Sequence, residues 1–308
     1  MTPAVVYIAA FSLLPIVWAV ALTFFDFSPR RTGTPFLGLG ADNPFVGLEH
    51  FRRMFDFSAD APLEVRQFHI AVKTTLIFAF LVVPLNLAIT LPLASMIESV
   101  GRRSRVLFRT IFFLPVLASS VGVAIIWGFV LHPQRGLLNA LLTKITGEYT
   151  VISWTADSSF IVLGLPVALF AILVAYLWQD IGYNLVIFVA ALQAIPESVK
   201  DAALVDGTSA WQRFRYVTLP LLKPTILLTS ILTMISAFQA FDLFQVMTDG
   251  GPGQPGQEQT RVLTLDIYEN AFRFQRMGWA AAVSLVLFLI VFLISRAQAR
   301  LLRVEWEY

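Results

Sequence analysis

The chain has 308 residues, of which 57% are hydrophobic and 14% are charged, and its mean hydropathy is +0.74. These values are too apolar for a soluble globular protein and place the chain in a bilayer. Its 22 basic and 20 acidic side chains leave a net charge of +2 without a basic run, which gives no support to nucleic-acid binding. The absence of cysteine excludes disulfides, thiolate metal sites and a cysteine nucleophile.

Six hydrophobic runs are long enough to cross the membrane as helices, because about 30 Å of hydrocarbon requires roughly 20 residues. The first run has no basic region before it, so we expect a retained span rather than a cleaved signal peptide. We therefore predict an all-α membrane protein with six transmembrane helices, forming a single domain over residues 1–308. The predicted spans are residues 3–25, 70–97, 106–131, 160–195, 225–247 and 277–295.

The fourth run raises the alternative of two spans, because Gln179, Asp180, Gly182 and Asn184 interrupt it. The part that follows these residues is only about 18 Å long as a helix, which is too short to cross the membrane alone. We therefore expect one bent or protruding helix.

Lysine and arginine are roughly twice as dense in the even-numbered connections and the C-terminal segment as in the odd-numbered connections, and cytoplasmic loops carry this excess. The sequence thus predicts that both termini and the loop between the fourth and fifth runs face the cytoplasm. A seven-span arrangement would place that loop outside.

A short amphipathic helix is predicted on the outer surface, between the third and fourth runs, because leucine and isoleucine recur there at helical spacing. We favour membrane anchoring over partner contact as its role. The apolar residues are Leu137, Leu138, Leu141, Leu142 and Ile145.

Residues 196–224, between the fourth and fifth runs, predict two short helices. Ser198 is the expected N-cap of the first helix, and Gly207 ends it because glycine adopts positive φ easily. Ser209 begins the second helix, with Gln212 at capping-box spacing. Neither helix is long enough to be stable in water alone, so each must dock on something. Judged on local physics alone, an ordinary interfacial loop fits these residues equally well.

The loop contains, in order, Ala202, Ala203, Asp206, Gly207, Phe214, Leu219 and Pro220. With this order it resembles the cytoplasmic coupling loop of permease subunits in binding-protein-dependent ABC importers. The pattern in that family is Glu-Ala-Ala, two residues, Asp-Gly-Ala, and later a Phe and Ile-x-Leu-Pro. The chain departs from it at Asp201 for Glu, Thr208 for Ala and Val217 for Ile. Trp211 and Phe214 are expected, from their size and apolar character, to be buried anchors of the loop. The resemblance implies an ATPase-coupling role for the loop. The implied coupling residues are Asp201, Ala202, Ala203, Asp206, Gly207, Trp211, Phe214, Leu219 and Pro220.

Stretches elsewhere extend the resemblance over nearly the whole chain. Residues 45–51, 108–115, 248–252 and 278–282 are similar to segments of sugar permeases of this family. Together they resemble the carbohydrate-uptake branch, in particular subunits like the larger membrane subunit of the maltose importer.

The resemblance implies a multi-subunit importer in the cytoplasmic (inner) membrane of a bacterium or archaeon. Its expected partners are a second homologous permease, two copies of an ATP-binding subunit, an extracytoplasmic sugar-binding protein and membrane lipid. No catalytic residue, metal or cofactor is expected in this chain, whereas ATP and Mg belong to the partner ATPase. Independently, a P-loop needs glycine immediately before its lysine, and none of the four lysines meets this requirement. The lysines are Lys73, Lys144, Lys200 and Lys223.

Polar side chains in the fourth and fifth runs predict the substrate pathway, because polar groups at membrane depth usually face a cavity or a partner helix. Carboxylates and amides bond sugar hydroxyls, and aromatic rings pack on the C–H face of a pyranose. The same groups can instead bond across helices to the neighbouring permease. The resemblance to the maltose importer predicts the location of the sugar contacts better than it predicts their residue types. Tyr183 is the best single match. The predicted residues are Tyr176, Trp178, Gln179, Asp180, Tyr183, Asn184, Ser236, Gln239 and Asp242.

The leading hypothesis is import of a sugar or oligosaccharide by alternating access. A polyol or glycerol phosphate is an alternative cargo, although no basic residue lies well inside the fourth or fifth run. A proton-coupled secondary transporter using Asp180 and Asp242 is a less favoured alternative. A membrane-embedded enzyme that uses the same two residues as general acid and base is the last alternative. The sequence offers no nucleophile, metal cluster or phosphate-binding pattern to support it.

Overall fold

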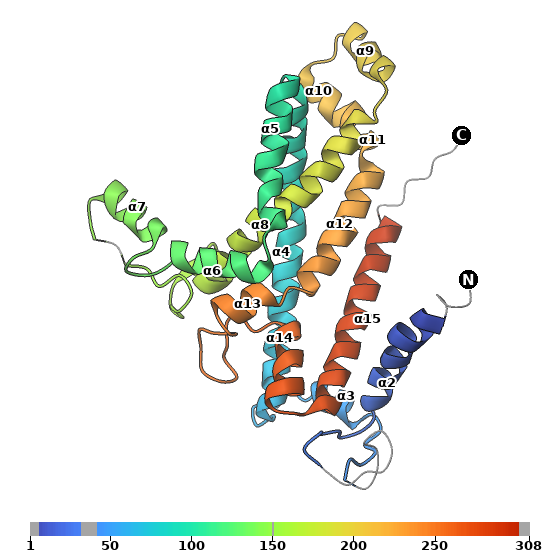
Figure 1. Cartoon of the computed structure of the whole chain (residues 1–308), viewed down its shortest axis with the longest axis vertical. Coiled ribbons are helices and arrows are strands. Elements are labelled where there is room, and N and C mark those ends of the chain that lie inside the picture. Colours follow the sequence, from blue (N-terminus) through green and yellow to red (C-terminus); the bar gives the residue numbers. More distant parts are fainter. Residues whose placement is uncertain (1–5, 32–41, 150, 302–308) are drawn as a thin grey trace. The chain divides into compact units, whose positions relative to one another are not determined.

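A computed structural model describes residues 6–31, 42–149 and 151–301, and helices dominate these segments (Figure 1). The chain forms two compact units. Unit 1 comprises Met1–Leu76 and Asp249–Val291, and unit 2 comprises Ile77–Thr248 and Phe292–Tyr308. Helices α4 (Leu63–Ser99) and α15 (Met277–Leu301) each contribute to both units.

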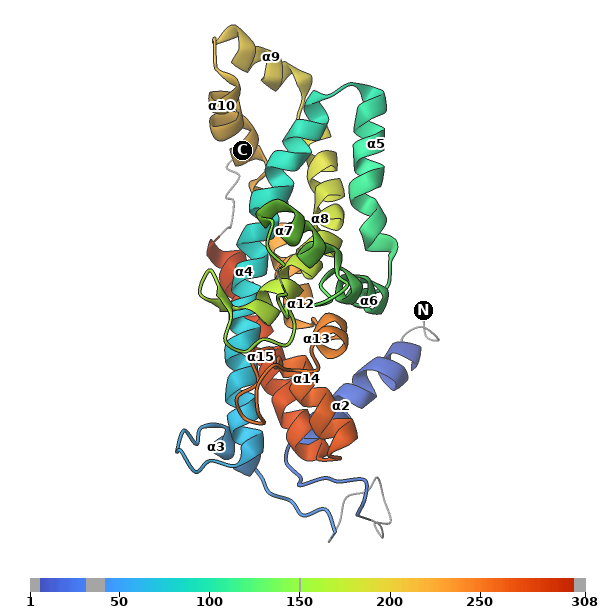
Figure 2. The ribbon, with the colours of Figure 1, turned by 90° about the vertical axis from the view of Figure 1, so that its left-hand side faces the viewer.

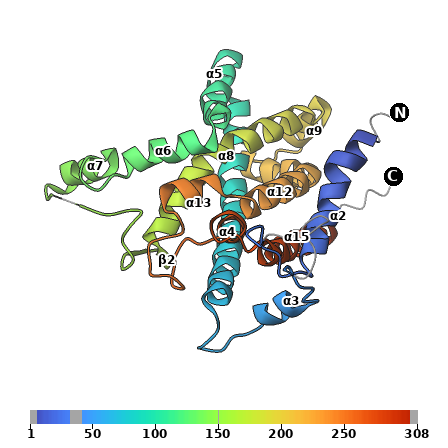
Figure 3. The same ribbon diagram turned by 60° about the horizontal axis from the view of Figure 1, so that its bottom comes forward.

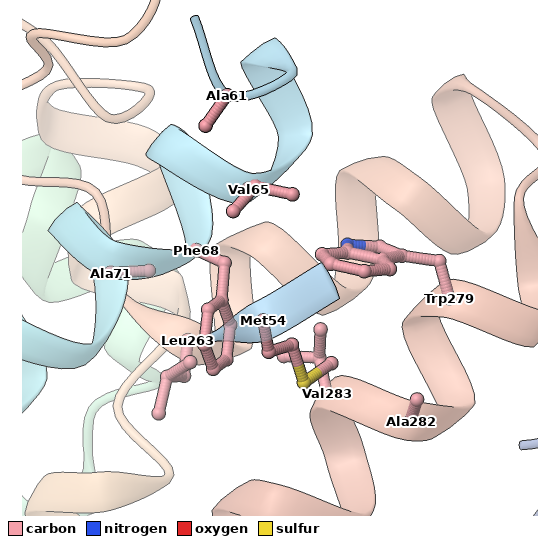
Figure 4. Close-up of a cluster of buried hydrophobic side chains, with 9 residues drawn as sticks. All are labelled: Met54, Ala61, Val65, Phe68, Ala71, Leu263, Trp279, Ala282 and Val283. Carbon is pink, nitrogen blue, oxygen red and sulfur yellow. The ribbon is translucent and has the colours of Figure 1, made fainter. Parts of the chain in front are cut away.

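Unit 1 is built around the first turns of α4 and of α15. An apolar cluster forms its core, and Figure 4 shows Met54 and Phe68 converging with Leu263 and Val283. Trp279, only 3% exposed, closes this cluster from α15. The other elements of unit 1 are η1 (Ala9–Leu13), α2 (Leu14–Leu22), α3 (Glu49–Met54), α14 (Leu263–Tyr268) and η4 (Glu269–Arg273).

A buried charge cluster also stabilises unit 1. The Arg261 side chain is 3% exposed and lies 2.8 Å from an Asp266 carboxylate oxygen and 2.7 Å from one of Glu269. Glu258 approaches the same guanidinium at 3.6 Å. Buried charges require such pairing, because an isolated ion loses its hydration without compensation.

Unit 2 contains the remaining helices and a small two-stranded antiparallel sheet that pairs Ile161 with Pro166. Figures 1 and 2 show α9 and α10 at the same end of unit 2 as one end of α5, while Figure 3 shows α6 and α7 extending away from α12. The elements are α5 (Arg102–Phe113), η2 (Leu114–Leu117), α6 (Ser120–Val130), α7 (Leu137–Thr146), β1 (Ile161–Val162), β2 (Leu165–Pro166), α8 (Val167–Gln193), α9 (Glu197–Val205), α10 (Ala210–Arg213), η3 (Phe214–Thr218), α11 (Leu219–Leu221), α12 (Lys223–Phe238) and α13 (Asp242–Met247).

Helix α8 is the central element of unit 2, and its apolar face packs on α4 through Leu185 and Phe188, both 0% exposed. On another side it meets α5 at Gly182. A Cβ added to this glycine would lie 2.1 Å from the carbonyl oxygen of Phe112. The missing side chain therefore permits the close approach of the two helices.

The predicted spans differ from the helices in continuity and length. Three described helices, α4, α8 and α15, are long and apolar enough to cross a membrane, and two bent pairs raise the number to five. In the first run the described residues form the shorter apolar helix Val6–Leu22, and the predicted start at Pro3 lies outside the described residues. The fourth run forms the single helix α8, which begins at Val167 because residues 161–166 form the small sheet.

Two of the predicted spans are broken rather than straight. The third run bends by 100° between η2 and α6, where Pro115 lies in η2 and Ser119 caps α6 by accepting a 3.1 Å bond from the amide of Gly122. A proline and a new N-cap both interrupt the regular helical hydrogen bonds. The fifth run ends as a regular helix at Phe238, and α13 begins only at Asp242.

The amphipathic helix predicted after the third run is confirmed as α7. Gly147 ends it with a φ of 74°, and Asn139 ties it to the following segment. The Asn139 amide nitrogen donates to the carbonyl oxygens of Pro133 and Ile152, and its side-chain oxygen accepts from the indole of Trp154.

Candidate functional site

Unit 2 contains a partly open cavity of about 490 Å³ that is lined by α8, the end of α12, the start of α13 and the two sides of the break between η2 and α6. The structure places seven of the predicted pathway residues in its wall: Tyr176, Gln179, Asp180, Tyr183, Ser236, Gln239 and Asp242. The structure thus brings together residues from two runs that are about 60 positions apart in the chain.

The α8 wall of the cavity is a stripe of polar and aromatic residues. Tyr176, Gln179, Asp180 and Tyr183 are spaced three and four residues apart, which places their side chains on one helix face. Gln179 also donates a 3.1 Å hydrogen bond to the backbone carbonyl oxygen of Ala118, at the break that precedes α6. The stripe therefore both lines the cavity and supports the broken backbone opposite it.

The second wall contains irregular backbone between α12 and α13. Ala240 and Phe241 lie in the cavity wall between Gln239 and Asp242, where neither helix continues. Irregular backbone at membrane depth is tolerated where it is buried in protein or lines a cavity. Around the break, the Ala240 amide donates to the carbonyl oxygen of Ala237 at 3.3 Å, and the Phe241 carbonyl oxygen accepts from the Gln245 amide at 2.9 Å. The break therefore shapes the cavity wall while these backbone groups stay paired.

Acidic and uncharged hydrogen-bonding groups dominate the chemistry of the cavity. Asp180 and Asp242 are its charged lining residues, and among the described residues neither a lysine nor an arginine lines it. Tyrosine hydroxyls and glutamine amides complete the set of donors and acceptors. This arrangement suits a ligand rich in hydroxyl groups and disfavours an anion.

Trp178 and Asn184, also predicted as pathway residues, lie outside the cavity lining. Trp178 is 42% exposed and packs edge-on against Trp127, with ring centroids 6.1 Å apart. Asn184 is 1% exposed and donates at 2.8 Å to the side-chain oxygen of Asn86 and at 2.7 Å to the hydroxyl of Thr233. Its role is thus an interhelical hydrogen bond rather than cavity lining.

Asn86 on α4 was not predicted as a site residue. It is 0% exposed, and its amide nitrogen donates a 2.8 Å hydrogen bond to Asp180. The signal was present in the sequence, because Asn86 is a polar residue inside the second hydrophobic run and intramembrane polar residues usually mark a functional site. Only the structure identifies its partner.

The loop between α8 and α12 contains the two predicted short helices, but the N-cap residue of the first differs from the predicted one. Helix α9 begins at Glu197 after Pro196, and no side chain caps it, so the prediction that Ser198 is the N-cap is wrong. Proline fixes its own φ and sets the chain direction at this point. Gly207 adopts a φ of 71° after the end of α9, and the Ser209–Gln212 capping box is confirmed.

The predicted coupling residues follow one another through these short elements. Asp201, Ala202 and Ala203 lie on α9, Asp206 and Gly207 follow it, Trp211 lies on α10, Phe214 begins η3, and Leu219 and Pro220 lie on α11.

The aromatic residues of the loop do not form a buried anchor within this chain. Trp211 is 69% exposed and stacks on Phe214 with ring centroids 5.9 Å apart. Leu204, Val205 and Tyr216 are also exposed, at 57%, 88% and 74%. The loop therefore presents an apolar surface, which often marks a contact with another protein.

Comparison with protein families gives a match over residues 90–303 to the family described as binding-protein-dependent transport system inner membrane component. The chain is 32% identical over 300 residues to the lactose transport system permease protein LacF of Rhizobium radiobacter, covering 97% of this chain and 91% of that protein. It is 33% identical over 274 residues to the sn-glycerol-3-phosphate transport system permease protein UgpA of Yersinia pseudotuberculosis, covering 87% and 84%.

The fold is similar to that of a chain in the crystal structure of a bacterial ABC transporter involved in the import of the acidic polysaccharide alginate. The TM-score is 0.77 at 21% sequence identity, and the match covers 98% of this chain and 92% of that chain.

Proposed function

The chain belongs to the family of binding-protein-dependent transport system inner membrane components, and from this premise we propose that it carries a neutral sugar or oligosaccharide across the inner membrane. It is a transport subunit and not an enzyme. The observation that carries the proposal is the cavity of about 490 Å³, in which carboxylates, amides and tyrosine hydroxyls face one another.

The charge of the cavity supports a neutral substrate. Asp180 and Asp242 line it without a lysine or arginine among the described lining residues. A phosphate or uronate entering this cavity would meet two carboxylates, and like charges repel by about 4 kcal/mol at 4 Å in a medium of intermediate polarity. Glycerol phosphate, suggested by the similarity to UgpA, is therefore the second candidate, and a polyol fits as well as a sugar.

Transport is driven, in this proposal, by alternating access coupled to partner ATPases. The exposed Leu204, Val205 and Trp211 form a surface on which an ATP-binding subunit can dock, and that contact would stabilise the short α9 and α10. Nucleotide-driven movement of the ATPases would then reach α12 through η3 and α11, which precede it directly in the chain.

The complete transporter in this proposal comprises this chain, a second homologous permease, two ATP-binding subunits that hold ATP and Mg, and an extracytoplasmic binding protein. Residues 196–224 and both termini face the cytoplasm, since lysine and arginine concentrate on that side. Helix α7 then lies on the outer side, where its exposed Leu137, Leu141 and Ile145 contact lipid.

The first experiment is a pull-down of the tagged chain from detergent-solubilised native membranes, followed by mass spectrometry. We expect a second permease and an ATP-binding subunit to be recovered. Recovery of this chain alone, under conditions that preserve another ABC transporter purified in parallel, would contradict the multi-subunit proposal and favour the secondary transporter.

The substrate class is tested by uptake into vesicles that contain the recovered complex and its binding protein. Radiolabelled lactose, maltose and glycerol represent neutral cargo, and glycerol 3-phosphate represents anionic cargo. We expect uptake of a neutral compound and at least tenfold less uptake of glycerol 3-phosphate. Uptake of glycerol 3-phosphate alone would overturn the neutral-substrate assignment while leaving the importer intact.

A further inference from the structure

A chain of hydrogen bonds leads from the cavity wall into the buried interior of unit 2. Asp180 accepts a 2.8 Å bond from the amide nitrogen of Asn86, and the oxygen of Asn86 accepts a 2.8 Å bond from Asn184. Asn184 also donates to the hydroxyl of Thr233 at 2.7 Å. We name these four residues, Asp180, Asn86, Asn184 and Thr233, the polar relay.

The polar relay joins three helices that are distant in sequence. Asn86 lies on α4, Asp180 and Asn184 lie one turn apart on α8, and Thr233 lies on α12. Asn86, Asn184 and Thr233 are at most 3% exposed. A buried polar group that loses its partner is unfavourable, so these bonds tie the positions of the three helices to one another.

The far end of the relay lies on the helix that leaves the coupling loop. Thr233 is ten residues, or about 15 Å, beyond the start of α12. The segment Ala210–Leu221 precedes α12 at an angle of 68°. Ser236, one turn beyond Thr233, lines the cavity. The relay therefore meets α12 between the coupling loop and the cavity.

We propose that the polar relay transmits movement between the coupling loop and the cavity, and that Asn86 is the positioning residue of Asp180. This inference rests on the proposed function and adds a mechanism to it. The Asn86 amide donates to Asp180 and accepts from Asn184 at the same time. A rotation that releases one bond strains or releases the other, so the orientation of the Asp180 carboxylate is tied to the placement of α8 and α12.

A second arrangement of the same groups is chemically available. The side-chain oxygen of Asn184 is buried and has no hydrogen-bond partner within the described residues. A buried acceptor without a partner is unfavourable. If α12 or α4 shifts so that a donor reaches the Asn184 oxygen, the new hydrogen bond offsets the loss of an existing one. Two discrete hydrogen-bond arrangements are the kind of element through which two sites influence each other.

The test uses a cysteine reporter, since the chain contains no cysteine. Ser236→Cys places a thiol on α12 in the cavity wall. The complex is purified through a tag on this chain, reconstituted in lipid nanodiscs, and labelled with a water-soluble maleimide with and without ATP plus vanadate. We expect the labelling rate to change at least fivefold on trapping the nucleotide.

Thr233→Val is the decisive variant and Thr229→Val is its matched control. Both replace a buried hydroxyl on α12, but among the described residues the Thr229 hydroxyl bonds to the backbone of its own helix alone, at Thr225 and Ile226. We expect Thr233→Val to reduce the nucleotide-dependent change to less than twofold and Thr229→Val to leave it intact. An unchanged response in Thr233→Val, in a complex that assembles normally, would overturn the relay.

A double-mutant cycle tests the positioning role of Asn86. Asn86→Leu and Asp180→Ala are introduced singly and together, and the KM for the transported neutral compound and the nucleotide response of the reporter are measured. If Asn86 acts through Asp180, Asn86→Leu raises KM several-fold alone and adds less than twofold in the Asp180→Ala background. Equal effects in both backgrounds would show that Asn86 is merely structural.

Failure of the relay and failure of the proposed function give different results. A parent complex that transports and responds to nucleotide, with the same response in Thr233→Val, excludes the relay alone. A parent complex whose reporter shows no nucleotide response excludes alternating access at this cavity, and with it the relay.

Discussion

Gln179 on α8 donates a 3.1 Å hydrogen bond to the backbone carbonyl oxygen of Ala118, where η2 and α6 meet at 100°. The break leaves backbone groups without their usual helical partners, and a glutamine amide supplies one of them. Gln179 also lines the cavity, so the same side chain connects the cavity wall to the break.

Replacement of Gln179 by methionine, which is of similar length but has no donor, is expected to destabilise the chain by about 1–2 kcal/mol. Gln179→Glu is expected to be at least as harmful, because a carboxylate oxygen facing a carbonyl oxygen is repulsive. The measurement is thermal unfolding of the purified complex in detergent. Equal melting temperatures for the parent and both variants would show that the bond to Ala118 is unimportant.

Gly182→Ala is expected to disrupt the contact between α8 and α5, since the added Cβ would lie 2.1 Å from the carbonyl oxygen of Phe112. Backbone must move to relieve this clash, and overpacking of this kind costs about 1–3 kcal/mol. Gly128→Ala on α6 is the control, because no atom lies within 4 Å of its added Cβ. The yield of folded chain after size-exclusion chromatography distinguishes the two variants, and similar yields would contradict the prediction.

Gly207 is expected to require a residue that tolerates positive φ, because its φ is 71° although no atom lies within 4 Å of an added Cβ. Gly207→Val should misplace the end of α9 at a cost of about 1–2 kcal/mol, whereas Gly207→Asn should be tolerated better, since asparagine adopts this conformation more readily. Uptake per ATP hydrolysed in the reconstituted complex is the measurement. We expect it to fall in Gly207→Val more than in Gly207→Asn.

Asp266 in unit 1 is expected to make stability depend on pH. Its side chain is 0% exposed; Oδ1 accepts bonds of 3.0 Å and 2.8 Å from Arg261, and Oδ2 has no partner within the described residues. Burial raises the pKa of this carboxyl from an ordinary value of 3.8 to about 6, and the neighbouring Arg261 only partly opposes the shift.

The sign of this dependence follows from proton binding. The folded state binds the proton more tightly than the unfolded state, so the contribution of Asp266 to stability is complete below pH 4 and is lost as the pH rises to about 6. Comparing melting temperatures of the parent and Asp266→Asn at pH 4.5 and pH 7 isolates this component. We expect the melting temperature of Asp266→Asn, relative to that of the parent, to be higher at pH 7 than at pH 4.5. The opposite trend would show that Asp266 is held as a carboxylate.

Much of the fold was predictable because local chemistry dictates it. The apolar runs could only be stabilised as helices in a bilayer, the leucine spacing of α7 fixed its amphipathic face, and the capping box from Ser209 to Gln212 set the start of α10. The polar stripe of α8 followed from helical periodicity, which places Tyr176, Gln179, Asp180 and Tyr183 on one face without knowledge of any neighbour.

Other features depend on partners that are remote in the chain. Hydropathy does not distinguish a straight span from one that bends by 100°, so the breaks at residues 118–119 and 239–241 were not predicted. Likewise, a polar residue in a hydrophobic run indicates that a hydrogen-bond partner exists, but the sequence does not identify that partner. Asn86 bonds Asp180 and Asn184, almost one hundred positions away.

The sequence by itself therefore determined the membrane class, the helical periodicity and the short-range caps, since each depends on residues within a few turns of one another. The tertiary structure decided where the spans break, which polar side chains share the cavity of unit 2, and that Asn184 bonds within the protein rather than lining that cavity. Those outcomes depend on interhelical distances, which are set by side-chain packing over the whole unit.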